Sequence, residues 1–366
     1  MNENQILTTL KLRAGEWVEV RNQAEILSTL DSTARLEELP FMPQMLTYCG
    51  QRFQVQKRAH KVCDTVNGTG ARSLSNAVIL EGLRCDGLAY GGCEMRCTII
   101  WKEAWLKRLT GSQDIQLHPS ARCSESDIWA GTRRTPKGED AEGPLYRCQA
   151  VQLPFATQQL PRWALWQYVE DYRSGNVRIS QILSSLFALL IHDLAESGLG
   201  FGSALRSAYD AIQRIRGGIP YPFRRGRIPA MSRTPSANTS IQVGELVKIK
   251  KYKDILETVD DKLINRGMAF HPEMATHCEK TFRVSQRLKK IMNEKTGQLM
   301  ELKNECLVLE GLYCVGHFTK PIYCPRATYP YWREIWLERI TDCSDNMQST
   351  EGMVYKPGRK RERAVT

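Results

Sequence analysis

Gly15-Glu16-Trp17-Val18, close to the start of the chain, returns as Gly244-Glu245-Leu246-Val247, 229 positions later. The same offset holds for about 70 residues, and a two-residue insertion then changes it to 231. Residues that match across the two offsets include Phe41/Phe270, Cys49/Cys278, Cys85/Cys314, Cys93/Cys324, Trp101/Trp332 and Trp105/Trp336. Because a repeat keeps the residues that an architecture needs, the sequence predicts one cysteine-containing scaffold present twice. The two stretches are called copy one and copy two below.

The composition is that of an ordinary globular protein with a basic surface. The chain has 366 residues, of which 42% are hydrophobic and 25% charged, and its formal net charge is +11. Residues 1–12 lack the apolar core of a signal peptide, and no stretch has the roughly 18 apolar residues of a membrane span. We therefore expect a cytoplasmic protein. In that reducing compartment its 12 cysteines are expected to be metal ligands or buried thiols before disulfides.

Short alternating segments separated by turns, such as residues 52–57, predict small antiparallel barrels. The opening pattern is similar to barrels of the Src-homology-3 type. The predicted fold class is α+β: two repeated small Src-homology-3-like β-barrel modules with cysteine-rich loops, joined by a helical segment. The predicted parts are copy one (12–110), an irregular connector (111–160), the helical segment (161–217), a linker (218–240), copy two (241–343) and a disordered basic tail (344–366).

Three helices are expected in the helical segment, at residues 163–173, 179–197 and 203–216. Each ends at glycine or at Ser-Gly-Asn, residues that stop helices readily. The middle one contains the most apolar stretch of the chain, residues 182–194, and is expected to be a buried helix. It is too short and too often interrupted by polar residues to be a membrane span.

The cysteines of copy one suggest a metal site. Cys85-x7-Cys93-x3-Cys97 lies in a glycine-containing stretch, and glycine lets the backbone wrap closely around a bound atom. Cys63 would complete a set of four thiolates, with His60 as a spare donor and Cys49 as a less favoured candidate. Four thiolates are the usual ligand set of tetrahedral zinc and of iron–sulfur clusters.

Copy two offers a related but different set. Cys306-x7-Cys314-x9-Cys324 is the core, with Cys278 as the possible fourth ligand. Neither copy contains the tight Cys-x2-Cys step typical of structural zinc sites, so zinc and an iron–sulfur cluster both remain open. The alternative is that several of these cysteines are buried thiols that act as small apolar residues. We favour that interpretation for Cys123, Cys148 and Cys343.

Two other functions fit parts of the sequence. Nucleic-acid binding is suggested by the charge, the small barrels and the tryptophan pairs Trp101/Trp105 and Trp332/Trp336, which would share a face if they were helical. Packing in the core is the more ordinary role for those pairs. A thiol enzyme would use a cysteine such as Cys97 or Cys278, the latter following His277. The six histidines form no recognised catalytic motif.

The motifs Leu83-Arg84-Cys85-Asp86-Gly87, Gly91-Gly92-Cys93 and Trp101-Lys102-Glu103-Ala104-Trp105-Leu106 resemble an uncharacterised family of duplicated bacterial proteins. Cys324-Pro325-Arg326 and Tyr329-Pro330-Tyr331-Trp332-Arg333-Glu334 in copy two carry the same resemblance. It spans most of the chain and implies a bacterial protein with an accessory role, and a protein partner, in a biosynthetic pathway. It supplies no catalytic residues. The expected function is therefore zinc or iron–sulfur binding in an accessory or electron-transfer protein.

Overall fold

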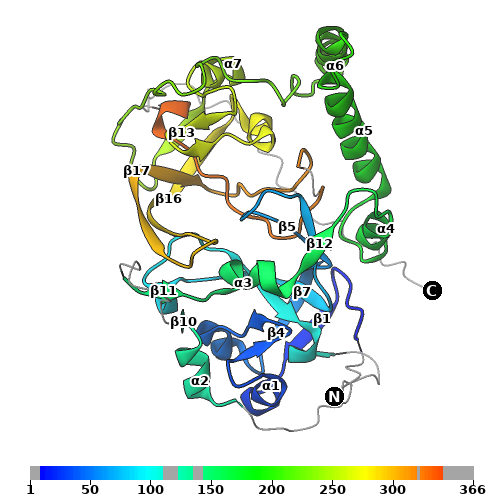
Figure 1. Ribbon diagram of the computed structural model, residues 1–366, viewed down its shortest axis with the longest axis vertical. Helices are drawn as coiled ribbons and strands as arrows, with labels where there is room; N and C mark the ends of the chain where they lie inside the picture. Colours follow the sequence, from blue (N-terminus) through cyan, green and yellow to red (C-terminus); the bar gives the residue numbers. More distant parts are fainter. Residues whose placement is uncertain (1–8, 110–122, 135–142, 320–321, 341–366) are drawn as a thin grey trace, which may run out of the picture.

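The computed structural model describes residues 9–109, 123–134, 143–319 and 322–340 and has mixed helix and strand content. Two curled antiparallel sheets, one in each copy, lie at opposite ends of the long axis (Figure 1). Cys343 and the expected disordered tail lie outside the described residues. None of the helices in the described ranges is both long and apolar enough to cross a membrane.

The sheet of copy one has the strand order β8-β7-β4-β1-β9. Its strands alternate buried and exposed side chains where one face covers the core, as in β1, where Val18 and Val20 are buried. Short elements fill the gaps between the strands. The elements of copy one are β1 (Trp17–Val20), α1 (Gln23–Thr29), β2 (Arg35–Leu36), β3 (Leu39–Pro40), η1 (Pro43–Tyr48), β4 (Arg52–Arg58), β5 (Lys61–Cys63), β6 (Ala71–Ser73), β7 (Ala77–Arg84), η2 (Leu88–Tyr90), β8 (Thr98–Lys102), η3 (Glu103–Trp105) and β9 (Leu106–Arg108).

The sheet of copy two has the order β17-β16-β13-β18. Its register is that of copy one moved by the repeat offset: Trp17 pairs with Gln54, and Leu246 pairs with Arg283. The long hairpin β16–β17 replaces the shorter strands β4 to β7. The elements are β13 (Leu246–Ile249), α7 (Tyr252–Leu256), β14 (Ile264–Asn265), β15 (Met268–Ala269), η4 (Pro272–His277), β16 (Thr281–Met292), β17 (Leu299–Leu309), η5 (Glu334–Trp336) and β18 (Leu337–Arg339).

The tryptophan pairs are in the two cores and not on a helix. Trp101 lies in β8 and Trp105 in η3, and both are fully buried, as are Trp332 and Trp336. Phe41 packs edge-on against Trp105 with ring centroids 5.1 Å apart, and Phe270 packs against Trp336 at 5.3 Å. The expected core role is therefore confirmed. A base-stacking role for these pairs is wrong, because no ring face reaches the surface.

The segment between the copies contains two parts. The first lies across the middle of the molecule and includes a helix that packs on copy one; the second is a helical arm along one side (Figure 1). The elements are α2 (Glu125–Ala130), β10 (Arg133–Arg134), β11 (Leu145–Tyr146), α3 (Gln149–Ala156), β12 (Gln158–Leu160), α4 (Trp166–Arg173), α5 (Ile179–Ala195) and α6 (Gly202–Arg216). The three expected helices thus form, the first beginning three residues later than predicted.

Helix α5 differs from the expectation of a buried helix. One face packs on the rest of the molecule through Ile182 and Leu189, whereas Leu183, Phe187 and Leu190 are more than half exposed. A run of apolar residues without clear periodicity predicts burial on all sides. Here α5 packs on the body through one face and contacts α6, and the apolar face that carries Leu183, Phe187 and Leu190 is left in solvent.

Candidate functional site

The loop that follows β7 brings three cysteines of copy one together. The N–H of Cys85 donates to the carbonyl oxygen of Cys97 at 2.8 Å, which closes the loop at its base. Between them Gly87 adopts φ 72°, and a Cβ at this position would lie 1.8 Å from the carbonyl oxygen of Cys93. Only glycine permits that close approach. The structure thus places Cys85, Cys93 and Cys97 in one glycine-dependent loop. Their expected role as metal ligands stays a prediction.

A fourth cysteine joins these three, and it is Cys148. Cys85, Cys93, Cys97 and Cys148 all line one small cavity of about 30 Å³, walled otherwise mainly by apolar side chains such as Met42, Ile100 and Leu153. Cys148 stands at the N-cap of α3. Cys63, which the sequence suggested as the fourth member, does not line this cavity. We call these four cysteines the first thiol cluster.

Backbone N–H groups point at three of the four sulfurs. The sulfur of Cys85 accepts a hydrogen bond from the N–H of Gly87. The sulfur of Cys148 accepts hydrogen bonds from the N–H groups of Ala150 and Val151. The sulfur of Cys93 accepts hydrogen bonds from those of Met95 and Met292. Such donors favour the thiolate form over the neutral thiol. Burial acts in the other direction and prevails. It raises the pKa of Cys85 to about 12 and of Cys148 to about 11, and it also raises the pKa values of Cys93 and Cys97.

Copy two builds the corresponding loop in the same way. The N–H of Cys314 donates to the carbonyl oxygen of Thr328 at 2.8 Å, and Thr328 stands where copy one has Cys97. Gly316, the counterpart of Gly87, has φ 77°, and its Cβ would lie 2.7 Å from the backbone nitrogen of Tyr323. Gly316 also donates its N–H to the sulfur of Cys314. The repeat therefore extends to the conformation of the cysteine loop.

The third cysteine at this second loop comes from copy one. The N–H of Cys63, at the end of β5, donates to the sulfur of Cys324 at 3.1 Å. Cys314 lies near enough to Cys63 and Cys324 to influence their charge. We call Cys63, Cys314 and Cys324 the second thiol cluster. It is shared by both copies of the repeat.

Each copy contributes one residue to the cysteine loop of the other copy. Met292, at the end of β16, is the counterpart of Cys63 in the repeat, and it lines the cavity of the first cluster while its N–H bonds to Cys93. The hairpin β16–β17 reaches toward copy one and toward β11 of the connector, and β5 reaches toward copy two (Figure 1). The backbone bonds Glu94 N–H to Lys290 O (2.9 Å) and Tyr146 N–H to Gly297 O (2.7 Å) fasten the hairpin.

Cationic groups surround the second cluster. Arg326 is buried and pairs with Glu294 at 3.0 Å, and its guanidinium lies 4.0 Å from the sulfur of Cys63. Burial raises the pKa of Cys324, but hydrogen bonds from the Cys63 thiol and from the Arg326 backbone outweigh this effect and lower it to about 7. Cys324 is therefore the one thiol of the second cluster whose pKa lies below its ordinary value, since the pKa values of Cys63 and Cys314 are raised.

The remaining cysteines of the predicted copy-two set lie elsewhere. Cys306 is fully buried against Leu288 and Val308, and Cys278 packs against the core of copy two. The set Cys278, Cys306, Cys314 and Cys324 is thus divided among three places. Within the described ranges, no group of three or more His, Cys, Asp and Glu side chains is arranged so that it could hold a metal ion.

The two cysteines suggested as nucleophiles have little thiolate character. Burial raises the pKa of Cys97 well above its ordinary value and that of Cys278 to about 12. Burial also lowers the pKa of His277 to about 4, so its ring is neutral near pH 7 and offers no positive charge to Cys278. At both residues burial therefore favours the neutral thiol over the thiolate near pH 7, and a role as nucleophile stays a prediction.

Cys148 is the functional candidate that the sequence missed. It lies 51 residues beyond Cys97, in the irregular connector, and has no counterpart in copy two. The only local signal is its position just before an apolar helical segment. Comparison with known protein families found no family model that matches the chain, and comparisons with curated proteins and with solved structures found no similar protein.

Proposed function

We propose that the protein binds an iron–sulfur cluster through Cys85, Cys93, Cys97 and Cys148 and acts as an electron-transfer accessory to a biosynthetic enzyme. The observation that carries this proposal is the first thiol cluster itself: four cysteines from two separate segments line one small cavity. Four thiolates are the standard ligand set of two- and four-iron clusters.

The surroundings of the four cysteines resemble those of an iron–sulfur site, but the cavity has to enlarge to hold one. Its volume of about 30 Å³ is about that of one water molecule, and the described side chains are not arranged to hold a metal ion, so the proposal requires the loop and the N-terminus of α3 to move apart when a cluster binds. Hydrogen bonds to the sulfurs and exclusion of solvent set the reduction potential of such a cluster. The N–H donors at Cys85, Cys93 and Cys148 and the apolar walls would supply both. The second thiol cluster has three cysteines and is one short of this ligand set.

Metal analysis tests the proposal directly. After anaerobic purification or reconstitution of the full chain, we expect iron and acid-labile sulfide together with visible absorption that bleaches on reduction. Cys148→Ser should abolish that absorption. Cys63→Ser, the matched control outside the cavity, should keep it. Stoichiometric zinc without iron, or a protein that loses its cluster with Cys63→Ser but not with Cys148→Ser, would refute the assignment.

We also propose that each curled sheet is a Src-homology-3-like barrel and that the protein works in the cytoplasm. The strand orders, the short strands and the shared register support the first proposal, and the free thiols of the described cysteines support the second. A crystal structure whose sheets superpose on known barrels of this type would test the fold. Cell fractionation followed by thiol labelling would test the compartment.

A further inference from the structure

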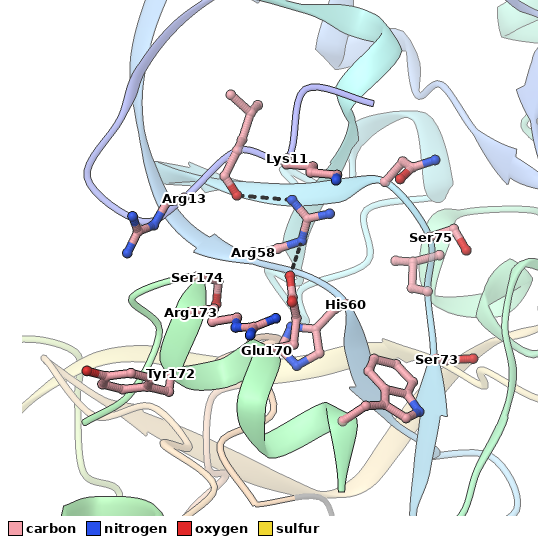
Figure 2. A pocket seen from close by; sticks show the side chains of 14 residues that line it. Lys11, Arg13, Arg58, His60, Ser73, Ser75, Glu170, Tyr172, Arg173 and Ser174 are labelled. Atoms are coloured by element: carbon pink, nitrogen blue, oxygen red, sulfur yellow. Dashed lines mark hydrogen bonds and ion pairs between the residues drawn. The ribbon is translucent and has the colours of Figure 1, made fainter. Parts of the chain in front are cut away.

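A second cavity lies where helix α4 meets copy one and has a volume of about 940 Å³; none of its lining residues is a cysteine. Its walls are the segment at Lys11 to Arg13, the end of β4 with His60, the stretch from Ser73 to Asn76, and helix α4 (Figure 2). Small-molecule sites have volumes of about 300–1,000 Å³. Helix α4 therefore turns the open side of a sheet into a recess of ligand size.

The rim of this cavity carries unpaired positive charge. Arg58 is committed to the fold, because it pairs with Glu103 and with Glu170 at 2.9 Å each. Lys11, Arg13 and Arg173 also line the cavity, and their side chains are exposed and form no ion pair with any described residue. Cations on the rim of a recess that have no protein partners are suited to an anionic group, above all a phosphate.

A buried histidine supplies a second kind of contact. His60 is only 5% exposed, and its Nε2 lies 3.2 Å from the carbonyl oxygen of Gln167 and 3.3 Å from Oδ1 of Asp171. Both neighbours are acceptors, so in the neutral ring Nε2 carries the proton and Nδ1 offers a lone pair. Nδ1 has no hydrogen-bond partner within the described ranges. An unpaired buried polar atom is costly, and a ligand hydroxyl that donated to it would remove this cost. Because the atom is itself buried, the ring of His60 has to turn toward the recess for that bond to form.

Trp166 adds a flat apolar surface to the same recess. Its indole is 50% exposed, and its ring centroid lies 6.3 Å from that of His60. Exposed tryptophan faces stack readily on planar rings. We propose that this cavity binds a nucleoside phosphate, with the base on Trp166, a sugar hydroxyl at Nδ1 of His60 and the phosphate on Arg13 and Arg173.

Copy two has a cavity at the equivalent position, but it lacks the histidine, the tryptophan and helix α4. This cavity has a volume of about 290 Å³ and is lined by Arg287, Asn304 and Glu305, the counterparts of Arg58, Ser75 and Asn76. Glu305 pairs with Arg287 at 2.8 Å, which is the role that Glu170 of α4 takes in copy one. The imidazole is replaced by Lys289, and tryptophan does not line the cavity. A variant at the copy-two cavity can therefore serve as a control for variants at the copy-one cavity.

Calorimetric titration of the full chain with AMP, GMP, CMP, UMP and their triphosphates tests the proposal, with ribose 5-phosphate and pyrophosphate as probes that lack a base. At least one nucleotide should bind, and ribose 5-phosphate should bind at least about tenfold more weakly. Arg173→Ala and Trp166→Ala, both at exposed positions, should each weaken binding on the order of tenfold. Lys303→Ala, at the copy-two cavity, should leave it unchanged.

Four results would overturn the inference, and the last of them is a special case of the first. One is the absence of binding by every nucleotide at millimolar concentration. Another is equal affinity for ribose 5-phosphate and the nucleotides. A third is binding that Lys303→Ala weakens as much as Arg173→Ala does. An oligonucleotide that binds while no mononucleotide does would likewise refute it, because the recess would then be part of a longer nucleic-acid surface. His60→Gln, which keeps a polar side chain, should also weaken binding while thermal denaturation shows the fold intact.

Discussion

Replacement of Gly87 by alanine should damage the first thiol cluster more than its backbone conformation alone would explain. The added Cβ would lie 1.8 Å from the carbonyl oxygen of Cys93, whereas carbon and oxygen atoms normally approach to about 3.3 Å. The two atoms must therefore separate by roughly 1.5 Å. Because the obstacle is backbone and not a flexible side chain, the loop that carries Cys93 has to move.

Gly82 provides the matched control. Its φ is 77°, close to the 72° of Gly87, but a Cβ there would meet nothing within 4 Å. In both variants the alanine must adopt a left-handed backbone conformation, which destabilises the folded state by roughly 1–2 kcal/mol. The steric term, about 1–3 kcal/mol for overpacking, applies to Gly87→Ala alone. We expect a total destabilisation of about 2–5 kcal/mol for Gly87→Ala and about 1–2 kcal/mol for Gly82→Ala.

Urea unfolding followed by tryptophan fluorescence measures the difference, because Trp101 and Trp105 are fully buried in the same core. Iron content per chain gives an independent readout of the loop. Copy two repeats the comparison with Gly316→Ala against Gly311→Ala, where the closest approach is 2.7 Å and nothing within 4 Å, respectively. If Gly87→Ala and Gly82→Ala unfold at the same urea concentration, the close approach to Cys93 is not what fixes the loop.

Three further changes test other parts of the structure. The carboxylate of Asp171 lies 2.5 Å from the buried ammonium of Lys61. Asp171→Ala leaves this ammonium without its partner and should lower the free energy of unfolding, measured by chemical denaturation, by about 3–5 kcal/mol. The double variant Lys61→Met/Asp171→Leu should recover most of that loss. Thr258→Val removes the acceptor 2.9 Å from the indole N–H of Trp336, and calorimetry should show a loss of about 1–3 kcal/mol. Burial raises the pKa of Asp31, but hydrogen bonds from Thr33 and Arg35 outweigh it and leave the pKa below its usual value. The carboxylate therefore stabilises the fold above about pH 4 and loses this effect below it, so the Tm advantage of wild type over Asp31→Asn should be constant from pH 7 to 5 and shrink toward pH 3.

The repeat in the sequence was sufficient to predict much of the scaffold. A gap-free offset predicts equal strand register, and Trp17↔Gln54 and Leu246↔Arg283 have it. Local spacing also predicts that Cys85, Cys93 and Cys97 share one loop. These features depend on residues that are near in sequence or fixed by the repeat, and such information is present in a single chain.

The membership of the two thiol clusters could not be predicted, because it depends on long-range packing. Cys148 reaches the first cavity only because α3 packs on copy one, and nothing in its local sequence encodes that contact. Cys63 was expected beside Cys85, since both belong to copy one, but β5 delivers it to the other copy. The spacing of Trp101 and Trp105 was misleading in another way: four residues fit one helix face, but here they span a strand and a 3-10 turn.

The reciprocal exchange of strand ends explains why the two clusters differ although their loops are alike. Each loop provides two cysteines at equivalent positions and receives one residue from the opposite copy, which is Met292 in one case and Cys63 in the other. The third loop position is Cys97 in copy one and Thr328 in copy two. In each cluster, therefore, only one of two positions is a cysteine: the third loop position in the first cluster and the residue from the opposite copy in the second. With Cys148 added from the connector, the first cluster reaches four thiols and the second stays at three. The first cluster thus takes its fourth thiol from the connector, and the second takes its third thiol from the opposite copy, so neither set of cysteines is complete within one copy.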